Sequence, residues 1–206
     1  MNILVQGFLL GLAYASPIGV QNIFVLTHTF KKGLITAISI ASIVAAMDIS
    51  LALVCIFGIG TLLQDFKVLQ IIINIGGALY LLFISYQLFK QVIKSDTIEL
   101  SDANNVKWSD IIFKSFLLTW LNPHAIIDGT TILGGYSVSF NSYSRGIFII
   151  GVALASLCWF ISISIMSTIL SSTKNSYKYF NYLKIFSATL IAVFAVKMFF
   201  NLKELI

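Results

Sequence analysis

The chain has 206 residues, of which 58% are hydrophobic and only 10% are charged, with a mean hydropathy of +0.95. Soluble domains carry roughly 25% charged residues, so this composition excludes an ordinary soluble protein and predicts an integral membrane protein. The net charge is +5. Because the lysines are spread along loop edges and form no basic stripe, this charge does not indicate a nucleic-acid partner.

Six apolar runs are each long enough to cross a membrane, since a spanning helix needs about 20 residues. They cover residues 3–27, 35–62, 68–90, 111–134, 145–170 and 180–201. We therefore predict an all-α, polytopic membrane protein with six transmembrane helices, in which residues 1–206 form a single transmembrane domain. Its halves would be 1–90 and 111–206, joined by a connector over 91–110 that is too short to fold as a soluble domain.

The distribution of basic residues predicts the orientation. When the loops are counted alternately, most lysines fall on one side of the membrane, and a smaller group with Arg145 falls on the other. The positive-inside rule places the lysine-rich side in the cytoplasm. We therefore expect a multi-pass protein of the cell (inner or plasma) membrane with both its N-terminus and its C-terminus outside.

The first predicted span is interrupted by Ser-Pro-Ile-Gly-Val-Gln-Asn over residues 16–22. Proline removes a backbone donor and clashes with the carbonyl one turn earlier, and the residue before it is pushed away from helical angles. Opened backbone at membrane depth persists only where it faces protein or a watered cavity. We therefore expect Pro17, Gly19, Gln21 and Asn22 to line a site.

Asp48 lies near the middle of the second predicted span, where an ionised side chain costs about 2.5–3.5 kcal/mol to insert. Ala41, Ala45, Ala52 and Cys55 share its helix face, so another helix or a ligand can approach the carboxyl closely. Two interpretations stay open. Asp48 is either a buried protonated aspartate hydrogen-bonded to a neighbouring helix or a site for substrate, proton or ion, and the second is favoured because intramembrane carboxylates are usually functional.

The fourth predicted span holds a second interruption, Trp-Leu-Asn-Pro-His over residues 120–124. Pro123 breaks the helix there, and Asn122 before it is displaced from helical angles. The two breaks match, since Asn22 and Asp128 each stand five residues after their proline. Three spans per half is an odd number, so a duplicated half would cross the membrane in the opposite direction. Paired breaks of this kind predict two inverted three-helix repeats with a transport site between them.

Ionisable side chains follow the second break. His124 and Asp128 are four residues apart and Thr131 lies three further on, so all three are expected on one face. A proton-linked carboxylate fits Asp128, whereas His124 is more readily interpreted as a fixed hydrogen-bond partner than as the titrating group. The candidate residues of the substrate or proton site are Gln21, Asn22, Asp48, Asn122, His124 and Asp128, with Pro17, Gly19 and Pro123 as the helix breaks that line it.

Small and aromatic residues elsewhere in the spans are interpreted as packing positions. Gly7 and Gly11 form a small-xxx-small face that favours close helix contact. Cys55 and Cys158 both fall inside spans and are assigned no disulfide or metal chemistry. Trp159, in the fifth span, is likewise interpreted as packing.

These motifs together resemble the LysE/ArgO family of basic amino-acid exporters. The Pro-Ile-Gly-Val-Gln-Asn run over 17–22 is similar to the first-helix signature of that family, and Asp48 matches its second-helix aspartate. The stretch from Trp120 to Asp128 resembles its fourth-helix signature, and residues 155–160 are similar as well.

The resemblance implies export of lysine, arginine or a near relative from the cytoplasm. The chain departs from the family at Val20, where proline is usual, and at Ile126, where an aromatic is frequent. We therefore expect a gentler bend at the first break and a substrate preference that differs from that of the family.

The residues themselves favour a cationic amino acid. Backbone N–H groups after each proline suit the substrate carboxylate, and Asp48 and Asp128 suit its cationic group. Moving one positive charge outward against the membrane potential costs about 2.3 kcal/mol per 100 mV. Electroneutral exchange for one entering proton is therefore the preferred coupling, and a high internal substrate concentration is the alternative.

Other functions remain open from the sequence. An exporter of another small solute, such as a neutral amino acid of the threonine or homoserine type, would use the same breaks. A metal cation is disfavoured, because two aspartates and one nearby histidine make a poor ligand set, and no cofactor is predicted. An intramembrane enzyme is the alternative from another class, although an HExxH spacing is absent from the sequence. The expected partners are a cationic amino acid, protons and the lipid bilayer, with a homo-oligomer left open.

Overall fold

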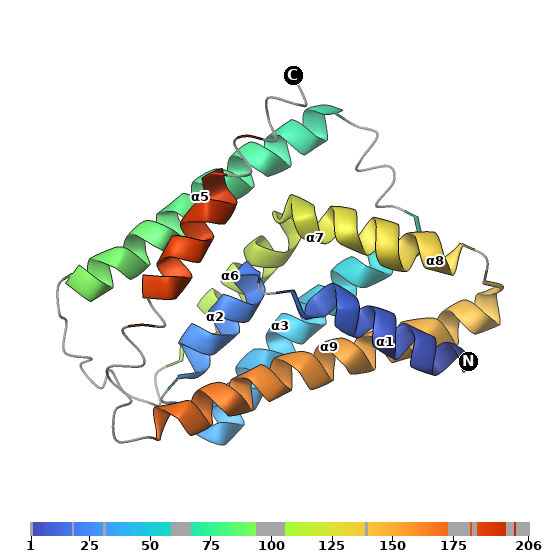
Figure 1. Ribbon diagram of the computed structural model, residues 1–206, viewed down its shortest axis with the longest axis horizontal. Helices are drawn as coiled ribbons and strands as arrows, with labels where there is room; N and C mark the ends of the chain where they lie inside the picture. Colours follow the sequence, from blue (N-terminus) through green and yellow to red (C-terminus); the bar gives the residue numbers. More distant parts are fainter. Residues whose placement is uncertain are drawn as a thin grey trace.

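The computed structural model describes residues 2–17, 19–30, 32–58, 67–93, 106–138, 140–172, 182, 185–196 and 200. Their regular structure is helical throughout, which confirms the all-α prediction for the described part of the chain. In chain order the helices are α1 (Ile3–Ala15), α2 (Val20–Thr29), α3 (Leu34–Ile56), α5 (Lys67–Ile93), α6 (Trp108–Trp120), α7 (Pro123–Asp128), the π-helix η1 (Gly129–Gly134), α8 (Gly135–Ser137), α9 (Ser142–Ser171) and a helix over Ile185–Val196 (Figure 1).

Two of these helices, α3 and α9, are each long and apolar enough to cross a membrane. The pair α1 and α2 also qualifies as one span, bent by 82° at the break between them. Every predicted apolar run contains helix, but the ends of the second and sixth runs and most of the 91–110 connector lie outside the described residues. The arrangement as six spans in two inverted repeats therefore stays a prediction.

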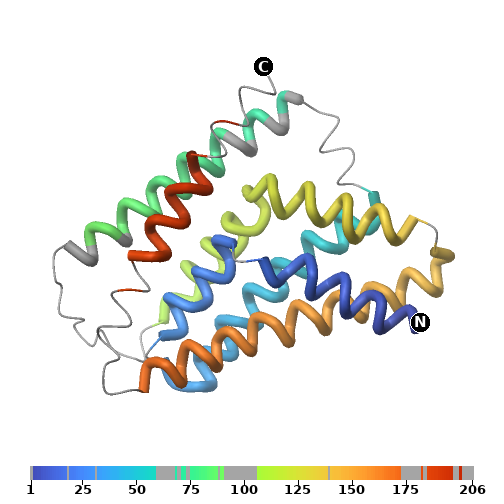
Figure 2. The backbone as a smooth tube through the Cα atoms, viewed as in Figure 1, coloured from blue at the N-terminus to red at the C-terminus, as the bar shows by residue number. Residues whose placement is uncertain are grey.

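The broken helices of each half of the chain pack against the long helix of the other half. In the first half, α1 and α2 lie against α9, and in the second half α6 and η1 lie against α3, while α3 and α9 contact each other. Figure 2 follows this arrangement along the chain, with α9 (orange) running below α1 and α2 and crossing α3. The long helix of each half thus supports the interrupted helix of the other.

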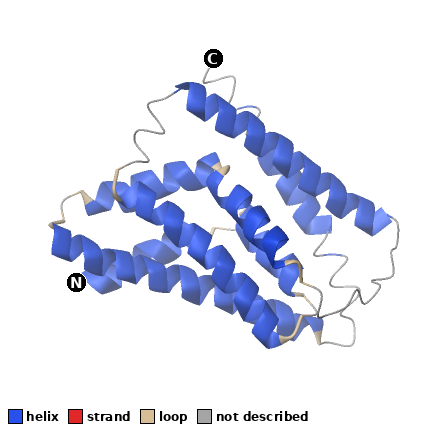
Figure 3. Cartoon of the chain, turned by 180° about the vertical axis from the view of Figure 1, so that it is seen from behind, coloured by secondary structure: helices blue, strands red, loops and turns tan. Residues whose placement is uncertain are grey.

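A second layer consists of α5 and the Ile185–Val196 helix, which lie side by side in Figures 1 and 3. The Ser85 hydroxyl donates a hydrogen bond of 2.9 Å to the Ala188 carbonyl, which joins the two helices. Leu81 on α5 and Ile191 on the last helix belong to the same buried cluster as residues of α2, α3, α6 and α9. This layer is therefore packed against the bundle that contains the breaks.

Close contact between α1 and α9 depends on glycine, as the small-xxx-small pattern predicts. A Cβ at Gly7 would overlap the backbone carbonyl of Phe148, and one at Gly11 would lie 2.9 Å from the Val152 Cα. On the opposite helix, a Cβ at Gly151 would overlap the Leu4 carbonyl. The two backbones touch, and no larger side chain fits between them.

We predict that Gly151→Ala destabilises the protein by about 1–3 kcal/mol, because the added methyl group forces α1 and α9 apart. Thermal unfolding of the purified protein in detergent measures the effect. Gly146→Ala on the same helix is the control, since a Cβ there meets open space. Equal melting temperatures for the two variants would contradict the packing assigned to Gly151.

Candidate functional site

A cavity of about 170 Å³ lies where the two helix breaks meet. A cavity needs only about 10–15 Å³ on the same measure to hold one water molecule, so this one has room for several waters or a small ligand. Its walls come from the α1–α2 break, α3, the α6–α7 break and the Ile185–Val196 helix. The lining residues are Tyr14, Ala15, Pro17, Gly19, Val20, Gln21, Asn22, Asp48, Asn122, His124, Ala125, Asp128 and Phe194.

This cavity brings together eight of the nine residues proposed from the sequence, all except Pro123. Pro123 is buried at the first position of α7. Proline is well suited to that position, because its missing N–H would have no helical partner there. Pro123 therefore sets the start of α7 at the second break, and it is not itself among the residues that line the cavity.

Asn22 holds the first break in place. Its side-chain amide donates to the Pro17 carbonyl at 2.6 Å and to the Ala15 carbonyl at 3.5 Å, and its oxygen accepts from the Trp159 indole N–H at 3.0 Å. The Asn22 side chain is buried and both ends of its amide are engaged. Asn22 thus partners two carbonyls that the end of α1 leaves without helical donors, a contact that the sequence did not reveal.

Trp159 packs against the buried cluster, as expected from the sequence, and it also makes a polar contact that was not expected. A buried indole N–H needs a hydrogen-bond acceptor, so a tryptophan inside an apolar span is a signal that a polar partner faces it. Here that partner is Asn22 on the broken helix.

Gln21 joins the two broken helices. Its amide donates to the Thr119 hydroxyl at 2.7 Å, and that hydroxyl donates to the Ser115 carbonyl at 2.8 Å. Asn122, in extended conformation with φ −100° and ψ 100°, marks the second break on the same side of the cavity. The first turn of α2 and the last turn of α6 are therefore tied together at the site.

Asp48 is hydrogen-bonded to a neighbouring helix, as one interpretation requires, and its role as a substrate, proton or ion site stays a prediction. Its side chain is only 1% exposed, and its carboxylate accepts a hydrogen bond of 2.6 Å from Ser156 on α9. It also lines the cavity. The face of small residues predicted around Asp48 is buried. Cys55, on the same face of α3, lies against Gly129, where an added Cβ would be 2.9 Å from the Cys55 sulfur.

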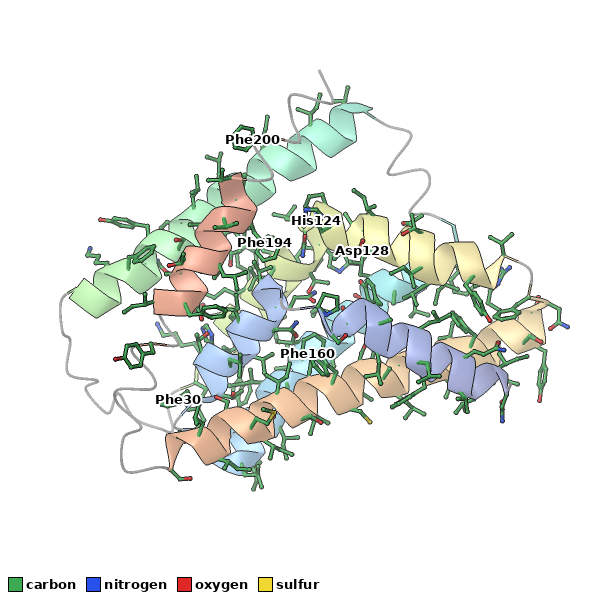
Figure 4. The ribbon with its side chains drawn as sticks, viewed as in Figure 1. Phe30, His124, Asp128, Phe160, Phe194 and Phe200 are labelled. Carbon is green, nitrogen blue, oxygen red and sulfur yellow. The ribbon has the colours of Figure 1, made fainter. Side chains whose placement is uncertain are left out.

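Asp128 and His124 are half-buried in the wall formed by α7. The Asp128 carboxylate accepts no hydrogen bond from the part of the chain that the structure describes. The His124 ring meets Phe194 edge to face with 6.5 Å between ring centroids, and Figure 4 shows Phe194 reaching toward it from the last helix. Asp128 is thus the carboxylate that remains available to a ligand.

Thr131, expected on the same face as His124 and Asp128, is exposed and is not among the residues that line the cavity. Its hydroxyl donates to the Ile127 carbonyl at 2.8 Å and to the Asp128 carbonyl at 3.3 Å. The π-helix η1 begins at Gly129, and its wider i→i+5 turns change the spacing of the residues that follow.

The cavity is acidic. It is lined by two carboxylates, and no lysine or arginine is among the described residues of its wall. Apolar helices of membrane-spanning length, two interrupted helices and a polar cavity between them are typical of transporters.

Comparison with known proteins identifies the family. The LysE type translocator family matches residues 12–202, and the chain belongs to it. The arginine exporter protein ArgO of Shigella flexneri is 33% identical over 165 residues, 79% of this chain and 76% of that protein. The ArgO protein of Pectobacterium atrosepticum is 31% identical over 173 residues, 83% of each chain. No solved structure matches this chain.

Membership of this family makes the chain a transporter and not an enzyme. Its apolar helices agree with a multi-pass protein of the cell membrane.

We predict that Trp159→Phe lowers stability by about 1 kcal/mol, because the Asn22 side-chain oxygen loses its donor inside the membrane. Thermal unfolding in detergent measures this change. Trp108→Phe, at an exposed tryptophan at the start of α6, is the matched control and should leave the melting temperature unchanged. If both substitutions act alike, the indole hydrogen bond does not hold the break.

Proposed function

We propose that this chain exports cationic L-amino acids, arginine or lysine, from the cytoplasm. The observation that carries the proposal is the cavity in which Asp48, Asp128 and both helix breaks meet. The names of its relatives, arginine exporter proteins, support an amino-acid substrate. In the proposed orientation both termini lie outside, because the lysine-rich loops favour the cytoplasm.

The cavity offers complementary groups to the two ends of such a substrate. The first turn of α2, with Gly19, Val20 and Gln21, forms one wall, and no side chain caps its N–H groups. These groups and the positive end of the α2 dipole suit the substrate carboxylate. Asp48 and Asp128 suit the ammonium or guanidinium group at the other end, whereas an anionic solute would meet two carboxylates and no basic side chain among the described wall residues.

Proton exchange supplies the driving force in this proposal. Export of a cation against an inside-negative potential costs about 2.3 kcal/mol per 100 mV, whereas exchange for one proton moves no net charge. Asp128 is the residue assigned to alternate between proton and substrate, because its carboxylate is available to the cavity. Asp48 is held by Ser156 and provides the second negative group.

We predict that Asp128→Asn reduces arginine and lysine efflux at least tenfold, because the variant can neither carry the exchanged proton nor neutralise the substrate. Efflux of radiolabelled amino acid from loaded proteoliposomes measures the rate, and immunoblots verify equal protein. Asp110→Asn, at an exposed position in the first turn of α6, is the control and should export normally. Wild-type rates from Asp128→Asn would exclude the proposed role. Competition by homoserine or threonine as strong as that by arginine would instead indicate a neutral substrate.

We further predict that an acidic exterior accelerates arginine efflux from proteoliposomes, because an inward proton gradient drives exchange. An imposed membrane potential should change the rate little, since no net charge moves. Two sets of efflux rates are compared. In one, potassium gradients with valinomycin set the membrane potential at a fixed pH, and in the other, a pH gradient is imposed at zero membrane potential. Efflux that follows the potential and ignores the pH gradient would show uniport of the cation.

A further inference from the structure

Tyr14 is a wall residue of the cavity that no sequence motif singled out. It lies in the last turn of α1, just before the first break, and is only 7% exposed. Its hydroxyl is buried and has no hydrogen-bond partner among the described residues. A buried polar group is normally partnered, so an unpartnered hydroxyl in the wall of a binding cavity points to a ligand.

The ring of Tyr14 is held by packing, and its side chain shares the cavity wall with two carboxylates. The ring edge lies 3.3 Å from the place a Cβ on Gly129 would occupy, and the ring belongs to a buried cluster with Leu133 and Phe148. Asp48 and Asp128 line the same cavity as Tyr14. The glycine at 129 gives the ring its space, and three oxygen-bearing side chains belong to the wall of one cavity.

The number of hydrogen-bond acceptors there matters for the choice of substrate. A lysine ammonium carries three N–H donors, whereas an arginine guanidinium carries five in a fixed plane. One carboxylate is already partly engaged, because Asp48 accepts a hydrogen bond from Ser156. A guanidinium therefore has two more N–H donors to satisfy than an ammonium, and they point along fixed directions in its plane, so an acceptor beyond the carboxylates serves arginine more than lysine.

We propose that Tyr14 is a substrate-binding residue whose phenolic oxygen accepts a hydrogen bond from the guanidinium group and so favours arginine over lysine. The proposal rests on the proposed function, since it concerns the same cavity and the same cationic substrates. The proposal adds the Tyr14 hydroxyl as the group that distinguishes arginine from lysine. A site that hydrogen-bonds a particular substrate group discriminates strongly against an analogue that lacks it, because the polar group of the protein is then left unpaired.

The test is Tyr14→Phe, which keeps the packed ring and removes only the hydroxyl. The ratio of kcat/KM for arginine to that for lysine is measured by efflux from proteoliposomes. We expect arginine export to fall about tenfold or more and lysine export less than about threefold, because a hydrogen bond to a charged group is lost for arginine alone. Tyr80→Phe is the matched control, since its hydroxyl also lacks a partner in the described structure but does not line the cavity.

Protection against thermal unfolding gives a second readout that does not depend on transport. Arginine should stabilise purified wild type and Tyr80→Phe more than lysine does, and this difference should shrink in Tyr14→Phe. An unchanged ratio of arginine to lysine in Tyr14→Phe, or an equal loss of both, overturns the role of Tyr14. If the wild-type protein moves and binds neither amino acid, the proposed function itself fails, which is a separate outcome.

Discussion

Opened backbone inside a membrane must find a partner within the protein, because no lipid group can replace the lost hydrogen bond. In this chain the constraint is met at the first break by one side chain. Asn22 donates to the carbonyls of Pro17 and Ala15 and is itself held by Trp159. With these two carbonyls partnered, the break forms part of the wall of the cavity, and α2 starts there with an uncapped first turn.

The straight helix α9 supports the site from outside it. Ser156 bonds Asp48 and Trp159 bonds Asn22, and these two residues are three positions apart, so they lie on one face of the helix. Further along, Gly151 brings the backbone of α9 against α1. One rigid element therefore positions the carboxylate, the break and the helix that carries Tyr14. A shift of α9 relative to α1 and α3 would alter all three together, which suits a transporter that must change the access of one site.

Much of this site could be predicted from residue types alone. Proline in an apolar run has a strong local effect, so both breaks were located, and a carboxylate at membrane depth is rare enough to mark Asp48 and Asp128. The sequence was less informative where polar atoms of aromatic residues and an irregular helix are involved. Thr131 does not line the cavity, and the π-helix η1 begins just before it. The hydrogen bond of Trp159 and the buried hydroxyl of Tyr14 were not predicted, because aromatic residues in spans usually serve packing.

By itself the sequence determined the class of protein, the two interruptions and the acidic character of the membrane interior, because composition and proline act locally and need no knowledge of the fold. It also indicated the family. Only the tertiary structure decided that the two breaks face one cavity, that Asn22 serves the backbone, and that Ser156 and Trp159 on α9 hold the site. These facts depend on which helices lie next to each other. Contacts between residues more than a hundred positions apart are set by packing, which no local pattern encodes.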